Sequence, residues 1–385
     1  MVFSGLDVSL GRESSLLRGA RVGFITNHTS VTRDLTPGVE ALLAAGVRVA
    51  ALFSPEHGLA GSAADGATVP SGLDRRTGLP IYSLYGQTRR PTPDMLTGLD
   101  VLLFDIQDVG ARFYTYVWTM THAMEAAAEA GSPFIVLDRP NPIGGGIVEG
   151  PVLEPAFSSF VGRYPVPVRH GLTAGELAAY VNSQFGVGAD LRVVPVESWR
   201  REQWFDETGL AWVPPSPAMP SLATATVYPG ACLIEGTNLS EGRGTALPFE
   251  VVGAPWVHGH ALAEALNGEA LPGVCFRAAQ FVPVASKWAG QVCCGVQWHV
   301  LDRRAFRPVE TALYLIAVIR SLWPEEFAWL AASWEGRAPH FDLLMGTDRV
   351  RRQLESGLPV ATVVAGWQAG LGAFRERRQS CLCYL

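Results

Sequence analysis

Glu56 is the residue of this chain that is best placed to do chemistry. It lies in a Pro55-Glu56-His57-Gly58 turn that directly follows the apolar run 47–53. Glutamate rarely forms turns, whereas the flanking proline and glycine restrict the backbone and would hold the carboxyl group in one direction. Partial withdrawal from water raises the pKa of a carboxyl group, which suits a general acid. The alternative is an exposed carboxylate paired with an arginine, and we favour the catalytic interpretation.

Polar residues also follow three other apolar runs that predict strands, at residues 21–26, 101–104 and 133–137. The carboxyl ends of parallel strands meet at one edge, which is where open α/β sheets bind ligands. Besides Glu56 and His57, the residues expected at this edge are Asn27, His28, Asp105, Gln107, Asp108, Asp138, Arg139 and Asn141. Asn and Asp often cap turns and helices. Four strands that all end in polar residues nevertheless favour a functional site.

A second group of candidate residues lies between positions 228 and 256. Glu235 and Glu241 stand there among Gly, Asn, Ser and Thr residues, and Arg243 adds a forked set of hydrogen-bond donors. Asn238 can bond sugar hydroxyls, and Trp256 offers a ring face that can stack on a sugar. Glycoside hydrolysis usually needs two carboxyl groups. This region therefore predicts part of a carbohydrate site.

The order of the expected elements predicts an α/β fold. Short apolar strands alternate with helices over the first 150 residues, which indicates a parallel sheet covered on both faces. The helices are expected at residues 37–45, 116–130, 173–185, 309–322 and 349–356, and further strands at 81–84 and 295–300. Residues 211–256 carry many Pro, Gly and Thr residues, and we expect them to form a long functional loop region.

Composition excludes several classes of function. The chain has 385 residues, 48% of them apolar and 17% charged, so it can fill a sizeable core in more than one domain. A net charge of −6 without a basic stripe argues against nucleic acid as a partner. The sequence contains no run of about 18 apolar residues, so it predicts no membrane span. The N-terminal residues do not resemble a signal peptide, so we expect a cytoplasmic protein.

No motif for a metal or a cofactor is found in the sequence. The six cysteines form no CxxC pair, so we expect free thiols instead of a zinc site or a disulfide framework. P-loop, HExxH and GxSxG motifs are missing, and residues 144–146 lack the spacing of a dinucleotide-binding loop. We therefore predict an enzyme that needs neither a metal nor a cofactor.

Four sequence blocks resemble the exo-β-N-acetylmuramidase family (NamZ type). They are residues 53–58 (FSPEHG), 105–114 (DIQDVGARFY), 138–142 (DRPNP) and 235–245 (EGTNLSEGRGT). The similarity runs in order from about Gly19 to the C-terminus. The resemblance implies a Rossmann-like domain without a nucleotide, which we place at residues 1–160 with Glu56. A smaller α/β (α+β) domain, residues 161–385, would complete the cleft.

The resemblance also implies an activity. Such an exo-acting glycoside hydrolase releases N-acetylmuramic acid from the non-reducing end of peptidoglycan fragments, and the family's catalytic glutamate falls on Glu56. We hypothesise that Glu56 is the general acid or a nucleophile-stabilising carboxylate, and that its partner is Glu241, Glu235 or Asp108. Arg112, Arg139 or Arg243 would bind the lactyl carboxylate of the substrate. The chain departs from the family pattern in the 61–68 loop, which has Asp65 and Ala67 but no Glu, and at Ala218, where Asn is expected. The substrate-binding residues expected are Asn27, His57, Asp105, Gln107, Arg112, Tyr114, Arg139, Asn141, Asn238, Arg243 and Trp256.

Two other functions compete with this interpretation. The first is a metal-dependent hydrolase with His28, Glu56, His57, Asp105, Asp108 and Asp138 as ligands, because oxygen ligands with imidazole suit Mg²⁺ or Mn²⁺. The second is a non-catalytic protein that binds sugars or muropeptides in the same cleft. Only a hydrolase would release product, and only a metal-dependent one would be stopped by EDTA.

Overall fold

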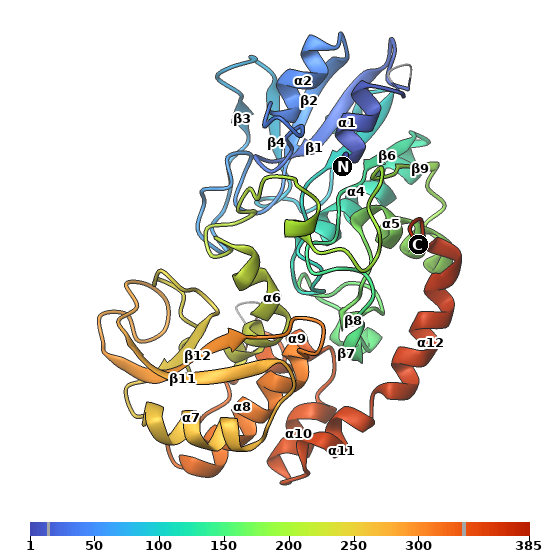
Figure 1. Cartoon of the computed structure of the whole chain (residues 1–385). Helices are drawn as coiled ribbons and strands as arrows, with labels where there is room; N and C mark the ends of the chain where they lie inside the picture. The colour runs from blue at the N-terminus through green and yellow to red at the C-terminus, as the bar shows by residue number, and fades with distance from the viewer. Residues whose placement is uncertain (14–15, 333–335) are drawn as a thin grey trace.

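A computed structural model describes residues 1–13, 16–332 and 336–385. Its larger sheet has seven strands in the order β3-β4-β2-β1-β5-β6-β9 (Figure 1). All neighbouring strands are parallel except β3, which runs antiparallel to β4. The strands are β1 (Arg21–Thr26), β2 (Arg48–Ser54), β3 (Gly72–Leu73), β4 (Pro80–Ser83), β5 (Val101–Asp105), β6 (Phe134–Leu137) and β9 (Leu191–Val194).

Side chains of this sheet alternate between two cores, as the pleat of a strand requires. In β1, Phe24 lies in one core and Ile25 in the other; in β2, Leu52 and Phe53 divide in the same way. One core is closed by α1 (Gly5–Leu10) and α2 (Gly38–Ala44), and the other by α4 (Tyr116–Ala130) and α5 (Ala174–Phe185). The short α3 (Pro93–Leu96) precedes β5. Helices therefore cover both faces of the sheet, as the apolar strands predict.

Local sequence signals set the ends of the two long helices on this sheet. Gly131 ends α4 with φ 66°, a left-handed conformation that suits glycine. Thr173 begins α5 by accepting a hydrogen bond from the backbone N–H of Glu176, whose carboxylate accepts one from the N–H of Thr173 in return. Gly131 thus ends α4 just before β6, and the Thr173 cap fixes the start of α5.

The second half of the chain forms a smaller α/β unit. Its antiparallel sheet has the order β10-β12-β11, with helices α6, α7 and α8 beside it (Figure 1). The elements here are α6 (Leu222–Ala231), the 3₁₀ turn η3 (Cys232–Gly236), β10 (Val251–Ala254), α7 (Gly259–Gly268), β11 (Val274–Phe281), β12 (Cys293–Val300) and α8 (Pro308–Leu322). The antiparallel pair β7 (Glu149–Val152) and β8 (Pro167–Arg169) lies between α4 and α5 in sequence.

The C-terminal segment returns to the large sheet. Helices α9 (His340–Met345), α10 (Arg349–Glu355) and α11 (Val360–Ala365) lead into α12 (Gln368–Arg378), which runs from the smaller unit back toward α5 (Figure 1). Beyond it, the Tyr384 hydroxyl donates to Asp138 Oδ2 at 2.5 Å and accepts from the N–H of Val196 at 2.9 Å. The last residues of the chain therefore anchor to the end of β6. Short 3₁₀ turns also occur at η1 (Pro155–Phe157), η2 (Phe205–Glu207) and η4 (Gln379–Cys381).

The predicted fold class is confirmed: a mostly parallel sheet with helices on both faces precedes a smaller mixed unit. The expectation that residues 211–256 form a long loop region is wrong, because α6, η3 and β10 lie inside it. Pro229 within α6 and a run of Thr and Gly residues masked the helical pattern. The division at residue 160 stays a prediction; α5 and β9, which follow it, pack on the larger sheet. Among the described residues, no helix is long and apolar enough to cross a membrane.

Candidate active site

Glu56 lies in an unusual turn at the end of β2. The strand ends at Ser54, and His57 has φ 67° while Gly58 has φ 76°. A left-handed conformation is uncommon for a residue with a side chain, and such outliers concentrate at functional sites. The turn is held by the N–H of Gly58, which donates to the Pro55 carbonyl at 3.0 Å, and by His57 Nδ1, which lies 2.7 Å from the Ala63 carbonyl oxygen.

Two donors from different segments fix the half-buried Glu56 carboxylate. Thr115 Oγ1 donates to Oε2 at 2.7 Å, and the N–H of Gly66 donates to Oε1 at 3.1 Å. Thr115 immediately precedes α4, so the carboxylate also lies close to the positively polarised N-terminus of that helix. Gly66 belongs to the loop that follows the Glu56 turn. The carboxylate is thus oriented by both of its oxygens.

Glu56 faces a cavity of about 210 Å³, which we call the inner cavity. Its walls are rich in aromatic rings from both halves of the chain: Tyr85, Phe113, Tyr114, Tyr116, Phe160, Tyr228 and Phe249. Burial, followed by the charge of Glu56, raises the pKa of both Tyr85 and Tyr116. These phenols therefore stay neutral, and the Tyr116 hydroxyl donates to the Pro215 carbonyl at 2.6 Å. Aromatic faces beside neutral hydroxyls suit a sugar ring, which has apolar faces and a polar edge.

The opposite wall of the inner cavity carries charge from η3 and the loop beyond it. Arg243 Nη2 donates to Glu235 Oε1 at 2.7 Å, and Nε donates to the same oxygen at 3.1 Å. His340 Nε2 lies 3.5 Å from Glu235 Oε2. Burial alone would raise the pKa of Glu235, but the Arg243 guanidinium and the hydrogen-bonded His340 lower it below its ordinary value. Glu235 is therefore ionised at neutral pH.

A second, more open depression of about 690 Å³ adjoins this wall, and we call it the outer cleft. Glu241 lines it and is 1% exposed. Its Oε2 lies 2.9 Å from Nζ of Lys287, the only lysine of the chain, and its Oε1 lies 3.6 Å from Arg243 Nε. Glu235, Arg243, Asp65 and Ala218 line both spaces. The two cavities are therefore neighbours that share one wall.

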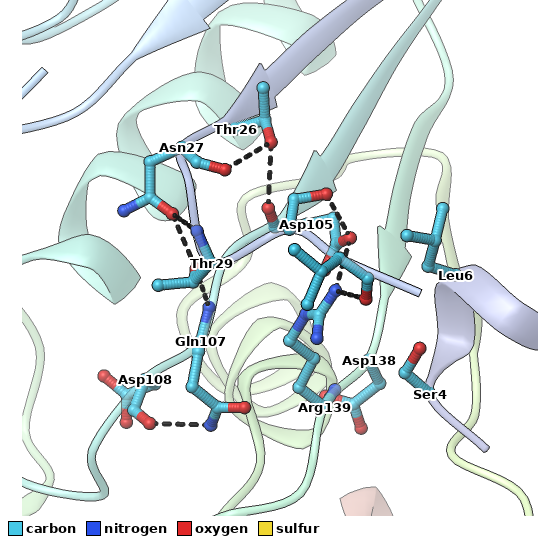
Figure 2. Close-up of polar contacts among 12 residues, drawn as sticks. Ser4, Leu6, Thr26, Asn27, Thr29, Asp105, Gln107, Asp108, Asp138 and Arg139 are labelled. Carbon is cyan, nitrogen blue, oxygen red and sulfur yellow. Dashed lines mark hydrogen bonds and ion pairs between the residues drawn. The ribbon is translucent and has the colours of Figure 1, made fainter. Parts of the chain in front are cut away.

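Most polar residues at the strand ends bond to one another (Figure 2). The Asp105 carboxylate accepts from Ser30 Oγ at 2.6 Å and from Nε and Nη2 of Arg139, the latter at 2.8 Å. Thr29 Oγ1 donates to Asn27 Oδ1 at 2.6 Å and accepts from the N–H of Gln107 at 2.9 Å. This network joins the ends of β1, β5 and β6, and none of its residues is among the described residues that line the inner cavity.

Other residues predicted for the site also bond within the protein. Arg112 is fully buried and donates to the carbonyls of Pro151, Val166 and Leu344 at 2.7–2.9 Å. Asn141 donates to the Leu172 carbonyl, and Asn238 to the Glu326 carbonyl. Trp256 packs near Trp323, with ring centroids 6.3 Å apart. Asp138 accepts from Thr173 Oγ1, the N–H of Gly175 and Tyr384.

Asp108 is a buried carboxyl group. The N–H of Gly110 donates to its Oδ2 at 2.7 Å, and His170 Nε2 lies 3.9 Å away from the same oxygen. Burial raises the pKa of Asp108 to about 7 and lowers the pKa of His170 to about 3. Asp108 is 6% exposed and is not among the described residues that line the inner cavity.

Of the predicted residues, the structure brings Glu56, His57, Tyr114, Glu235 and Arg243 to the inner cavity and Glu241 to the outer cleft. Sequence reasoning missed Thr115 and Tyr85. A threonine directly before a helical run is an N-cap signal, and Tyr85 follows a short strand, so both positions carried a local cue. No group of three or more His, Cys, Asp or Glu side chains in the described parts of the chain is arranged to hold a metal ion. His28 instead bonds the Pro214 carbonyl at 2.7 Å.

Comparison with known proteins identifies the family. The model of the N-terminal part of exo-β-N-acetylmuramidase NamZ matches residues 22–223, and the model of its C-terminal part matches residues 226–384. The chain belongs to the exo-β-N-acetylmuramidase NamZ family. It is 48% identical over 384 residues to the peptidoglycan β-N-acetylmuramidase NamZ of Bacillus subtilis (strain 168), covering 100% of this chain and 91% of that protein.

Two crystal structures of DUF1343 family proteins from Bacteroides fragilis NCTC 9343 share the fold. One is 37% identical with a TM-score of 0.91, and the other is 30% identical with a TM-score of 0.79. Each alignment covers 100% of this chain and 99% of the other. The NamZ family membership therefore extends over both halves that build the inner cavity.

Proposed function

We propose that this chain is an exo-acting β-N-acetylmuramidase that releases N-acetylmuramic acid from the non-reducing end of peptidoglycan fragments, with Glu56 as its general acid. The observation that supports this most directly is the inner cavity itself. There, a carboxylate held by Thr115 and Gly66 faces aromatic walls and an arginine. The full-length similarity to the muramidase of Bacillus subtilis supports the same activity.

Glu235 is our candidate for the second carboxylate. Glycosidases pair a protonated acid with a carboxylate that stabilises the positive charge developing on the sugar or activates water. Glu235 lines the same cavity as Glu56, and its lowered pKa keeps it ionised. Glu241 lines the outer cleft and not the inner cavity, and Asp108 is buried and lines neither, so neither shares the inner cavity with Glu56.

Arg243 is our candidate for binding the lactyl carboxylate that distinguishes N-acetylmuramic acid from N-acetylglucosamine. A guanidinium binds carboxylates with two parallel hydrogen bonds. Arg243 lines the cavity with a side chain that is 19% exposed. The other two arginines considered are not among the described residues that line the cavity: Arg112 bonds buried carbonyls and Arg139 bonds Asp105.

A chromogenic β-N-acetylmuramide and the matching β-N-acetylglucosaminide test this function. We expect release from the muramide alone, unchanged by EDTA, and a loss of at least 100-fold in kcat for Glu56→Gln, since general acids contribute about 10²–10⁴-fold. Glu264→Gln, an exposed change on α7, is the matched control and should retain full rate. Wild-type turnover by Glu56→Gln, or release that EDTA abolishes, would refute the assignment. Sugar binding without any release would indicate a binding protein.

A further inference from the structure

The wall between the inner cavity and the outer cleft contains an ion pair between two distant segments. Asp65 lies in the loop that follows the Glu56 turn, and Arg243 lies in the loop that follows η3. The carboxylate of Asp65 bonds Nη1 of Arg243. Both residues line both spaces, so this pair closes part of the boundary between them.

The three acidic partners of Arg243 differ in how firmly they are held. Glu235 receives two hydrogen bonds from Arg243 and its side chain is 16% exposed. Glu241 is 2% exposed at its side chain and is neutralised by Lys287. Asp65 is 48% exposed and comes from a loop. An ion pair with a half-exposed partner gains little net free energy, because water competes for both charges. Asp65 is therefore the partner that another anion can replace.

The position of Asp65 is coupled to the catalytic turn. Its Oδ1 lies 3.6 Å from His57 Nε2, and the next residue, Gly66, donates its N–H to Glu56. A backbone shift of Asp65 away from Arg243 would also move Gly66, whose N–H orients the Glu56 carboxylate. Release of the pair would also join the inner cavity to the outer cleft, which a sugar chain crossing from one to the other requires.

We infer that Asp65 competes with the carboxylate of the substrate for the Nη1 edge of Arg243, and that its displacement opens the wall between the two cavities. This inference rests on the proposed function, which places the muramyl residue beside Glu56. The carboxylate of such an amino sugar breaks the ion pair between Asp65 and Arg243 and forms a new one with Arg243 in its place. A neutral amino sugar has no group that can do so and leaves Asp65 on Arg243. Asp65 therefore lowers the affinity for the carboxylate-bearing sugar alone, and its removal should widen the preference for N-acetylmuramic acid over N-acetylglucosamine.

Calorimetric binding of N-acetylmuramic acid and N-acetylglucosamine to the full chain tests the competition. We expect Asp65→Asn to bind N-acetylmuramic acid about two- to fivefold more tightly than the wild type, because its competitor is removed, and to bind N-acetylglucosamine within twofold of the wild type. Asp190→Asn is the matched control: it removes one negative charge at an exposed position beside the edge strand β9 and should change neither affinity.

Kinetics provide a second readout that a purely structural role would not give. Asp65→Asn should lower KM for the chromogenic muramide by a similar factor without raising kcat, and Arg243→Lys should weaken N-acetylmuramic acid binding at least tenfold with N-acetylglucosamine unchanged. Equal affinities of wild type and Asp65→Asn for N-acetylmuramic acid would overturn the competition alone. Failure of the wild type to bind N-acetylmuramic acid would overturn the proposed function and this inference together.

Discussion

Replacement of Thr115 by valine separates the orientation of Glu56 from the stability of the fold. Valine has the shape of threonine but removes the hydroxyl that donates to Glu56 Oε2 at 2.7 Å. Thr115 precedes α4, yet its side chain makes no capping hydrogen bond to that helix. Because water can replace this donor at the half-buried carboxylate, the substitution should lower the free energy of unfolding by no more than about 1 kcal/mol.

The expected effect on catalysis is much larger. Hydrogen bonds to charged groups contribute about 1.5–3 kcal/mol, and about 1.4 kcal/mol corresponds to tenfold in rate. If the full contribution is needed to orient Glu56 in the transition state, kcat falls about 10- to 150-fold. The assay is release of chromophore from the muramide, with urea denaturation on the same preparations.

Thr119→Val is the matched control, one turn further along α4. Its hydroxyl contacts only the Thr115 carbonyl, at 3.5 Å, and is not directed at Glu56. Its kcat should stay within twofold of the wild type. Wild-type kcat and KM in Thr115→Val would refute the reasoning, because Glu56 would then not depend on the donor that the structure assigns to it. A parallel fall in stability would show that the hydroxyl acts on the fold instead.

Three further changes test other parts of the structure. In Gly61→Ala the new Cβ atom would lie 1.9 Å from Cε1 of His28, at a backbone φ of +68°. The 59–70 loop must therefore shift, and kcat/KM should fall at least tenfold. Gly72→Ala, whose Cβ atom would meet no neighbour within 4 Å, is the control and should be neutral in the same assay. Burial raises the pKa of Glu149 from 4.5 to about 7. The native carboxyl keeps a proton that the unfolded chain releases, so its contribution to stability falls as the pH rises from about 4.5 to 7. Urea denaturation should therefore show Glu149→Gln to be more stable than the wild type by about 1–3 kcal/mol at pH 8 and similar to it at pH 4; a pH-independent difference would contradict this. Tyr384→Phe leaves the buried N–H of Val196 without its acceptor at 2.9 Å and should cost about 1–3 kcal/mol in denaturation with kcat unchanged; a matching loss of kcat would show that the anchored C-terminus shapes the site.

The sequence predicted the sheet and the Glu56 turn well because both depend on local patterns. Apolar runs bounded by Gly, Pro and Asn marked β1, β2, β5 and β6, and their polar ends did collect at one edge of the sheet. What it could not show was which polar ends face a ligand. Asp105 and Arg139 satisfy each other, a pairing across 34 positions that no local signal reveals. Thr115 and Arg243 reach the cavity from helices and loops whose relative placement depends on tertiary packing.

The contacts between the two halves of the inner cavity also have a consequence for catalysis. The inner cavity is built from two halves, with Glu56, Tyr85 and Thr115 on one side and Glu235 and Arg243 on the other. Contacts that hold these halves together include the bond from Tyr116 to the Pro215 carbonyl, at 2.6 Å, and the bond between His28 and Pro214. Both acceptors lie in the segment that leads into α6 and η3, and hence to Glu235.

Residues that join the two halves and residues that face the cavity should therefore differ in how their substitution changes stability and kcat. Removal of the Tyr116 hydroxyl loosens the connection on which the position of Glu235 depends, so stability and kcat should fall together. Removal of the Thr115 hydroxyl affects one carboxylate and should change kcat alone. The contact between the two halves then sets the distance between Glu56 and Glu235. Substitutions in that contact can change this distance in a glycosidase of this kind while both carboxylates stay in place.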